Sequence, residues 1–287
     1  MGLEPQVASP RSLAEAYGVL AAAPADAPAR PIAGGTDLMV ALTGELGEPL
    51  ASVVDLWAID GLRGIAVDGA ALHLGALTTY TQIRQSTLCR EDAPALVQAA
   101  ATIGAVQIQN RGTLGGNIAN ASPAGDTLPA LLAADARFVL GSVRGEREVA
   151  AADFWIGYRR TALAHDELIT RVIIPLVSGR EIRYRKVGTR RAQSISKVVI
   201  AVAWRAGTGA WRDVRVAFGS VAATPIRAAR TEAVLEGSPP TPEVADRAAQ
   251  SLADELSPID DVRSTAGYRR VVAARILHRI VREAGGW

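Results

Sequence analysis

Hydrophobic and polar positions follow two different periods along the chain, and the period changes from segment to segment. Apolar residues at helical spacing predict helices at 12–22, 37–42, 78–86, 93–103, 127–134, 227–235, 242–256 and 267–283. Short apolar or alternating runs predict strands at 29–32, 53–56, 168–174, 181–187, 197–205 and 214–220. Two hairpins are expected at 64–77, which turns at Asp68-Gly69, and at 137–149. This mixture of antiparallel pairs and helices predicts an α+β fold.

The pattern also divides the chain into two parts. Its 287 residues are many for one hydrophobic core, so two domains are expected. The composition shifts around Val177-Ser178-Gly179, where hairpins and short helices give way to three strand-like runs followed by helices. We therefore predict one domain at 1–176. A smaller domain at 177–287 is expected to pack a three-stranded antiparallel sheet against helices.

Two glycine-rich segments carry the clearest functional signal. They are Pro31-Ile32-Ala33-Gly34-Gly35-Thr36-Asp37 and Arg111-Gly112-Thr113-Leu114-Gly115-Gly116-Asn117-Ile118. Glycine permits positive φ and close approach, so successive backbone amides can form a concave anion-binding site. Two such segments predict a long ligand with a central diphosphate, and the alternative is a pair of tight turns without a ligand. The few apolar residues between 110 and 127 predict a long functional loop there.

Composition and motif spacing exclude several classes of function. Neither segment has the G-x-G-x-x-G or G-x-x-x-x-G-K-[ST] spacing, which argues against Rossmann and P-loop sites. One cysteine and three widely separated histidines argue against a disulfide, a zinc site and an iron–sulfur cluster in this chain. The formal charge of +2 argues against nucleic-acid partners. The longest apolar runs are too short to span a bilayer, and with no targeting segment in view a cytoplasmic protein is expected.

The same segments resemble a known family. AGGTD after a short apolar run, then TIGAVQIQNRGTLGGNIANASPAGDTLPALLA, is similar to the flavoprotein (medium) subunit of molybdenum hydroxylases, which include carbon-monoxide and xanthine dehydrogenases. Segments at 166–175, 183–198 and 267–270 extend the resemblance over nearly the whole chain. It implies an FAD-binding domain of the PCMH/vanillyl-alcohol-oxidase type, with two lobes, and a C-terminal domain of the CO-dehydrogenase flavoprotein type. One departure is the absence of lysine and arginine between Asp37 and Arg63.

The resemblance also implies which residues bind FAD. They are Pro31, Ile32, Ala33, Gly34, Gly35, Thr36, Asp37, Leu38, Ile103, Gly104, Gly112, Thr113, Leu114, Gly115, Gly116, Asn117, Asn120, Gly125, Asp126, Leu168, Ile169 and Lys186. The amides of both glycine-rich segments would bind the diphosphate, Asp126 would accept from ribityl or ribose hydroxyls, and Lys186 would place a positive charge near the flavin.

Considered without the resemblance, some of these residues have ordinary structural interpretations. Asp126 is a candidate N-cap for the helix at 127–134. Lys186 would be a solvated surface lysine, because lysine is rarely buried. Leu168 and Ile169 would be core residues of a β-strand. These alternatives stay open at the level of the sequence.

The function implied by the resemblance is electron transfer within a larger enzyme. FAD would be held here, the molybdopterin cofactor by a large partner chain and 2Fe-2S clusters by a small partner chain, assembled as a dimer of heterotrimers. No catalytic side chain and no metal site are expected in this chain, because the cofactor carries the chemistry. One alternative is a stand-alone flavin oxidase or reductase of the same fold, with Tyr158 or His165 as acid or base. Another is a scaffold subunit without cofactor, against which the intact glycines argue.

Overall fold

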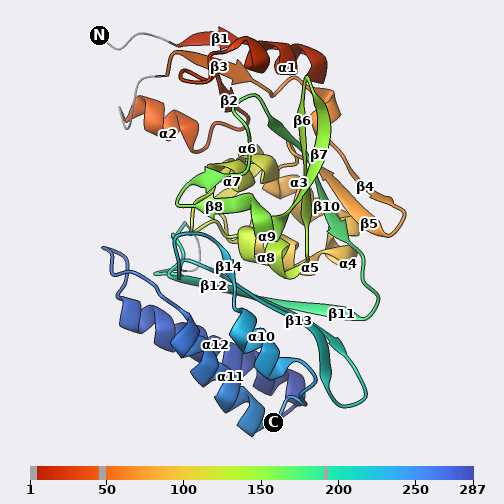
Figure 1. Ribbon diagram of the computed structural model, residues 1–287, viewed down its shortest axis with the longest axis vertical. Coiled ribbons are helices and arrows are strands. Elements are labelled where there is room, and N and C mark those ends of the chain that lie inside the picture. Colours follow the sequence, from red (N-terminus) through yellow and green to blue (C-terminus); the bar gives the residue numbers. More distant parts are fainter. Residues whose placement is uncertain (1–4, 45–49, 191–192) are drawn as a thin grey trace.

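The computed structural model describes residues 5–44, 50–190 and 193–287, and it places the successive sheets along the long axis of the molecule (Figure 1). The first sheet is parallel, with β3 (Ser52–Asp55) between β1 (Gln6–Ala8) and β2 (Arg30–Ile32). Helix α1 (Leu13–Ala22) lies beside it and is capped by Ser12, whose hydroxyl accepts from the amide of Glu15 at 3.2 Å. Helix α2 (Leu38–Thr43) follows β2.

The second sheet is antiparallel and confirms both predicted hairpins. Its strand order is β4 (Ile65–Asp68), β5 (Ala71–Gly75), β10 (Leu168–Pro175), β6 (Arg137–Ser142) and β7 (Gly145–Ala150). The turn η1 (Asp60–Leu62) leads from β3 into this sheet. Short elements connect its strands: α3 (Tyr80–Gln85), α4 (Thr87–Asp92), α5 (Pro94–Ala101), α6 (Val106–Arg111), α7 (Leu114–Asn120), α8 (Leu128–Ala133), α9 (Ala151–Phe154), β8 (Trp155–Gly157) and β9 (Arg160–Thr161). This sheet and its helices form the middle of the molecule (Figure 1).

One prediction for this region is wrong. The segment 110–127 is not a long unstructured loop, because it contains α7 and the last two residues of α6. Helix α7 is capped by Thr113, whose hydroxyl accepts from the amide of Gly116 at 3.1 Å. Burial of Leu114 and Ile118 stabilises this helix in spite of the low helix propensity of its two glycines. Helices α4 and α6 and the turn η1 were also not predicted from the apolar pattern.

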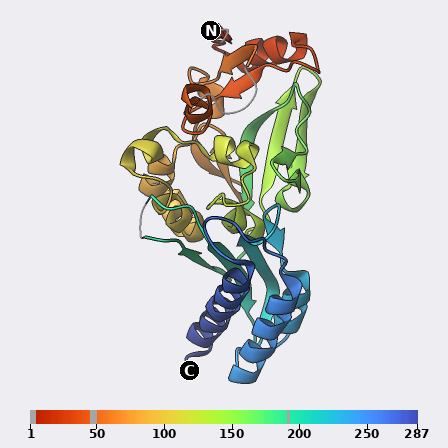
Figure 2. The same cartoon turned by 90° about the vertical axis from the view of Figure 1, so that its left-hand side faces the viewer.

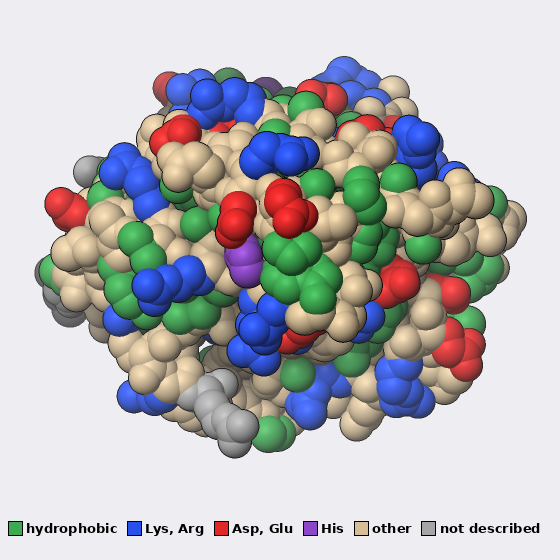
Figure 3. Space-filling view, turned by 90° about the horizontal axis from the view of Figure 1, so that it is seen from below, with side chains coloured by type: hydrophobic (Ala, Val, Ile, Leu, Met, Phe, Trp, Pro, Cys, Tyr) green, Lys and Arg blue, Asp and Glu red, His purple; other side chains and the backbone are tan. Residues whose placement is uncertain are grey.

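The third sheet has four strands, whereas three were predicted. Its antiparallel order is β11 (Arg180–Val187), β12 (Val198–Ala206), β13 (Trp211–Gly219) and β14 (Ile226–Arg227). The two residues of β14 are too few to produce an alternating pattern in the sequence. Helices α10 (Ala229–Leu235), α11 (Pro242–Glu255) and α12 (Ala266–Gly285) cover one face of this sheet, as predicted (Figures 1 and 2). Figure 3 shows the end of the molecule where these helices lie, and acidic and basic side chains are interspersed on that surface.

Strand β12 is buried on both faces, which explains its continuous apolar sequence. Its larger side chains, such as Ile200 and Trp204, belong to the core under the C-terminal helices. Its smaller ones, Ala201 and Ala203, belong to the core that includes α8 and the second sheet. The third sheet therefore forms a common layer between the two cores.

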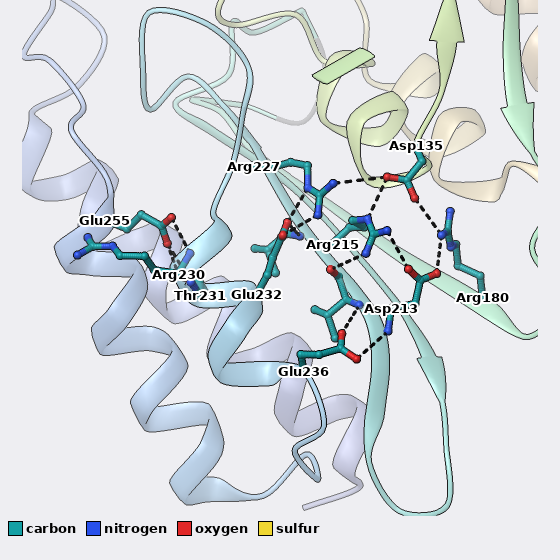
Figure 4. Close-up of polar contacts among 12 residues, drawn as sticks. Asp135, Arg180, Asp213, Arg215, Arg227, Arg230, Thr231, Glu232, Glu236 and Glu255 are labelled. Atoms are coloured by element: carbon teal, nitrogen blue, oxygen red, sulfur yellow. Dashed lines mark hydrogen bonds and ion pairs between the residues drawn. The ribbon is translucent and has the colours of Figure 1, made fainter. Parts of the chain in front are cut away.

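A cluster of charged residues fixes α8 against this sheet (Figure 4). Asp135, which follows α8 with a left-handed φ of 53°, accepts hydrogen bonds from Arg180 and Arg215, each at 2.9 Å, and pairs with Arg227 at 3.5 Å. Asp213 also accepts from Arg180, at 2.6 Å. Because α8 starts directly after residues 122–126, the cluster helps to fix that turn relative to the third sheet.

Candidate functional site

A cavity of about 880 Å³ opens between the middle of the molecule and the third sheet. Its volume lies within the range of roughly 300–1,000 Å³ that is typical of cofactor and small-molecule sites. The predicted site residues on its wall are Thr36, Asp37, Ile103, Gly104, Asn117, Asn120, Gly125 and Asp126. Residues separated by up to 90 positions in the sequence are thus brought to one cavity.

The first glycine-rich segment presents unused backbone donors. It leaves β2 at Ile32, and Gly35 has a φ of +74°, a conformation that favours glycine. Among the described residues, the amides of 34–37 donate to no protein acceptor. Thr36 and Asp37 lie in the cavity wall, and the Asp37 carboxylate accepts from Asn120 at 3.2 Å. A row of unpaired amides at a cavity is suited to binding an anion.

Glycine at position 34 is required by contact with the second segment. A Cβ atom there would lie 1.8 Å from the carbonyl oxygen of Arg111 and 3.1 Å from the amide nitrogen of Gly112. No side chain fits in that space. The two glycine-rich segments are therefore in direct backbone contact, and the shape of the first depends on the position of the second.

The second segment uses its amides within the protein, which contradicts part of its predicted role. The amide of Leu114 donates to Thr78 O and that of Gly115 to Ala76 O, each at 2.9 Å. The amide of Gly116 donates to the Thr113 hydroxyl. The diphosphate-binding amides predicted at 114–116 are thus already paired, because they form the capped first turn of α7. This segment contributes the side chains of Asn117 and Asn120 to the cavity wall instead.

Asp126 and Lys186 form a buried ion pair at the cavity. Lys186 Nζ lies 2.6 Å from Asp126 Oδ2 and donates to Thr102 O at 3.0 Å, and both side chains are at most 10% exposed. Asp126 Oδ1 is buried and accepts no hydrogen bond from the described residues. Burial raises the pKa of Asp126 to about 6, although the charge of Lys186 opposes this shift.

This geometry decides between the alternatives for these two residues. Asp126 is not the N-cap of α8, because Thr127 occupies that position and no side chain caps the helix. Lys186 is buried, not solvated. The pair joins β11 to the turn that leads into α8.

Other predicted site residues are not part of the cavity wall itself. Leu168 and Ile169 pair with Gly141 and Leu140 in the second sheet and are buried in its core, which agrees with their structural interpretation. Within the described residues, the predicted positions that the wall does not include are Pro31, Ile32, Ala33, Gly34, Gly35, Leu38, Gly112, Thr113, Leu114, Gly115, Gly116, Leu168, Ile169 and Lys186.

Several residues on the wall were not predicted. Arg159, at the turn between β8 and β9, has a left-handed φ of 51° and donates to Asn120 Oδ1 at 3.0 Å. Ser196 precedes β12 and Ser220 follows β13, and the two side chains hydrogen-bond to each other at 2.8 Å. The amide of Ser220 donates to Pro123 O, so the sheet supports the turn at 122–126. No local motif marks these positions, because their roles arise only from the tertiary fold.

Two family models cover the chain. The FAD binding domain in molybdopterin dehydrogenase matches residues 3–177, and the CO dehydrogenase flavoprotein C-terminal domain matches residues 183–284. The first match spans more than half of the sequence. The chain belongs to the molybdopterin-dehydrogenase FAD-binding family. This confirms the resemblance and, with it, the predicted fold class.

Sequence and structural similarity to individual proteins supports this family assignment. The nicotinate dehydrogenase FAD-subunit of Eubacterium barkeri is 34% identical, over 91% of this chain and 90% of that protein. The nicotine 6-hydroxylase medium subunit of Paenarthrobacter nicotinovorans is 33% identical, over 97% and 96%. A chain of reconstituted CO dehydrogenase from Oligotropha carboxidovorans is 29% identical, with a TM-score of 0.93 over 100% of this chain and 99% of that chain.

Three further findings concern metal ions, membranes and the single cysteine. In the ranges that the structure describes, no group of three or more His, Cys, Asp and Glu side chains is placed to hold a metal ion. None of the described helices is long and apolar enough to cross a membrane. Cys89 is buried, and burial raises the pKa of its thiol.

Proposed function

We propose that this chain is the FAD-binding electron-transfer subunit of a heterotrimeric molybdenum hydroxylase. A large partner chain would hold the molybdopterin cofactor and a small partner chain the 2Fe-2S clusters. Membership of the family and the names of the relatives, which are FAD or medium subunits of dehydrogenases and hydroxylases, support this function. The observation that carries it is the row of unpaired amides at 34–37 beside a cavity of cofactor size.

FAD fits the residues at this site. Its diphosphate needs several donors, and the amides of 34–37 with the Thr36 hydroxyl offer them. Its ribityl and ribose hydroxyls can donate, and Asp126 Oδ1 is a buried acceptor without a donor. A buried acceptor left without a donor is energetically costly, so a ligand hydroxyl there would be stabilising. Ile103 offers an apolar wall for a flat ring.

Bound FAD supplies one- and two-electron transfer, which no side chain of this protein provides. The residues of the chain bind and orient it. Lys186 holds Asp126 in its ionised form near neutral pH, so the pair is overall neutral beside the cofactor. A ligand hydroxyl that donates to Asp126 also favours the ionised carboxylate and lowers its pKa.

The remaining parts of the proposal concern the assembly. We propose that the heterotrimer forms a dimer in the cytoplasm, that residues 1–176 form the FAD-binding domain and that residues 177–287 form the C-terminal domain. Substrate choice would rest with the large chain. The alternative of a stand-alone oxidase is less well supported, because His165 is exposed and lies off the cavity wall, although Tyr158 lies on it.

Affinity purification of a tagged chain from its native cells tests the proposed function. We expect a yellow complex with two further chains, one containing molybdopterin and the other iron and acid-labile sulfide, and one FAD per tagged chain. Recovery of the chain alone with FAD and an oxidase activity of its own would support the stand-alone alternative. A colourless chain that does not take up FAD even in the complex would support the scaffold alternative.

A further inference from the structure

The close contact between the two glycine-rich segments requires that the backbone of Arg111 be held in a fixed position relative to Gly34. The carbonyl of Arg111 lies where a Cβ of residue 34 would be, so a small shift of Arg111 would change the backbone at 34–37. Arg111 is the last residue of α6, a helix of six residues. So short a helix has little stability of its own, and tertiary contacts must hold its end in place.

The Trp57 side chain makes such a contact. The guanidinium carbon of Arg111 lies 3.7 Å from the centroid of the Trp57 ring, and that of Arg63 lies 4.7 Å from the same centroid. Both distances are within the range of a cation–π interaction. Arg63 Nη2 also donates to the carbonyl of Trp57 at 2.5 Å, which ties the tryptophan backbone to the second cation.

Trp57 is itself anchored to the strand pair that leads to Gly34. Its amide donates to Asp55 Oδ1 at 2.9 Å, and the amide of Leu56 donates to Ile32 O at 2.9 Å. Asp55 is the last residue of β3 and Ile32 the last residue of β2. The indole therefore reaches from the sheet that delivers the first glycine-rich segment to the residue that opens the second.

We propose that Trp57 is a positioning residue for the cofactor site. Its indole holds Arg111 in place, and Arg111 in turn keeps the amides of 34–37 in the conformation that binds a diphosphate. This inference rests on the proposed function, since it takes FAD as the ligand. A cation–π interaction of this kind corresponds to about 3- to 30-fold in an equilibrium constant. Removing the indole should weaken FAD binding by that factor.

The test uses the assembled complex, from which FAD is removed and then titrated back while flavin fluorescence is recorded. We expect Trp57→Ala and Arg111→Gln each to raise the Kd for FAD about 3- to 30-fold, and Trp57→Phe to raise it less because an aromatic face remains. The double variant should have a Kd for FAD no higher than that of the single variant with the higher Kd, because both substitutions remove the same Trp57–Arg111 interaction. Trp287→Ala is the matched control, since Trp287 contacts His278 and Pro240 far from the cavity, and its Kd should equal that of the wild type.

The outcomes separate this inference from the proposed function. A purely structural role for Trp57 would lower the melting temperature of the apo and FAD-bound complexes equally and leave the Kd unchanged, which would overturn the inference. Additive effects of Trp57→Ala and Arg111→Gln would also overturn it. Should Trp57→Ala not fold, the exposed Arg111 still provides the test through Arg111→Gln and its Kd. A wild-type complex that binds no FAD would contradict the proposed function instead.

Discussion

Replacement of Gly34 by alanine tests the contact between the glycine-rich segments. The new Cβ would lie 1.8 Å from Arg111 O, and it must retreat by roughly 1.2 Å to reach even the shortest distance that real Cβ atoms show. Overpacking typically costs about 1–3 kcal/mol, and a clash with backbone, which cannot rotate away, belongs at the upper end. In the apo protein the segment can move away from this clash, but FAD binding requires it to return, so the same cost opposes binding. Because about 1.4 kcal/mol is tenfold, about 3 kcal/mol predicts roughly 100-fold weaker FAD binding.

The assay is FAD content per chain of the purified complex, followed by titration of FAD into the apo complex. Gly18→Ala in α1 is the matched control, because nothing lies within 4 Å of its added Cβ. It should keep full FAD content and gain slightly in stability, since alanine is the better helix former. If Gly34→Ala binds FAD as tightly as the wild type, the two segments do not form the cradle described above and the assignment of the site is wrong.

Four further predictions follow from the site and the fold. Gly116→Ala should retain FAD, because Gly116 has no left-handed φ and its Cβ would lie 2.9 Å from the Thr113 hydroxyl, which needs to shift by only about 0.1 Å to reach the shortest distance that real Cβ atoms show; FAD content checks this. Lys186→Met should lower the free energy of unfolding by about 3–5 kcal/mol in chemical denaturation, because it leaves Asp126 buried without its counter-charge. FAD affinity should be constant well above pH 6 and fall as pH drops through about 6, because a hydroxyl donor binds the ionised Asp126, whose pKa is raised to about 6, and the proton must leave first. Asp126→Asn should abolish this dependence in Kd measurements across that range. Asp135→Ala should lower the free energy of unfolding by about 2 kcal/mol, because three arginines lose their shared partner (Figure 4). Glu181→Ala, which breaks an exposed pair with Arg183, should lower it by only about 0–1 kcal/mol in the same denaturation assay.

Local patterns were sufficient for much of the fold. The predicted turn at Asp68-Gly69 lies within one residue of the observed turn, Gly69-Ala70, in the β4–β5 hairpin, and the apolar alternation around it is readable from neighbouring residues. The continuous apolar run of β12 was also predicted, because a strand buried on both faces needs apolar residues at every position. Helix α7 was missed, since its glycines disfavour a helix and burial of Leu114 and Ile118 overrides that preference.

The candidate site was predicted only as far as its sequence motifs extend. Thr36, Asp37, Asn117 and Asp126, which the motifs and the resemblance singled out, line one cavity. Which amides are free was not predictable, because it depends on carbonyls such as Ala76 O that lie far away in sequence. The same holds for Arg159, whose place on the wall depends on the β8–β9 turn.

Hydrogen–deuterium exchange of the apo and FAD-loaded complex tests the central claim most directly. The account predicts that FAD binding slows exchange of the amides at 34–37, which are unpaired in the protein, and leaves those of Leu114 and Gly115 nearly unchanged, since they already donate to Thr78 O and Ala76 O. Unchanged exchange at 34–37 in a complex that demonstrably contains FAD would contradict the claim that this segment binds the cofactor.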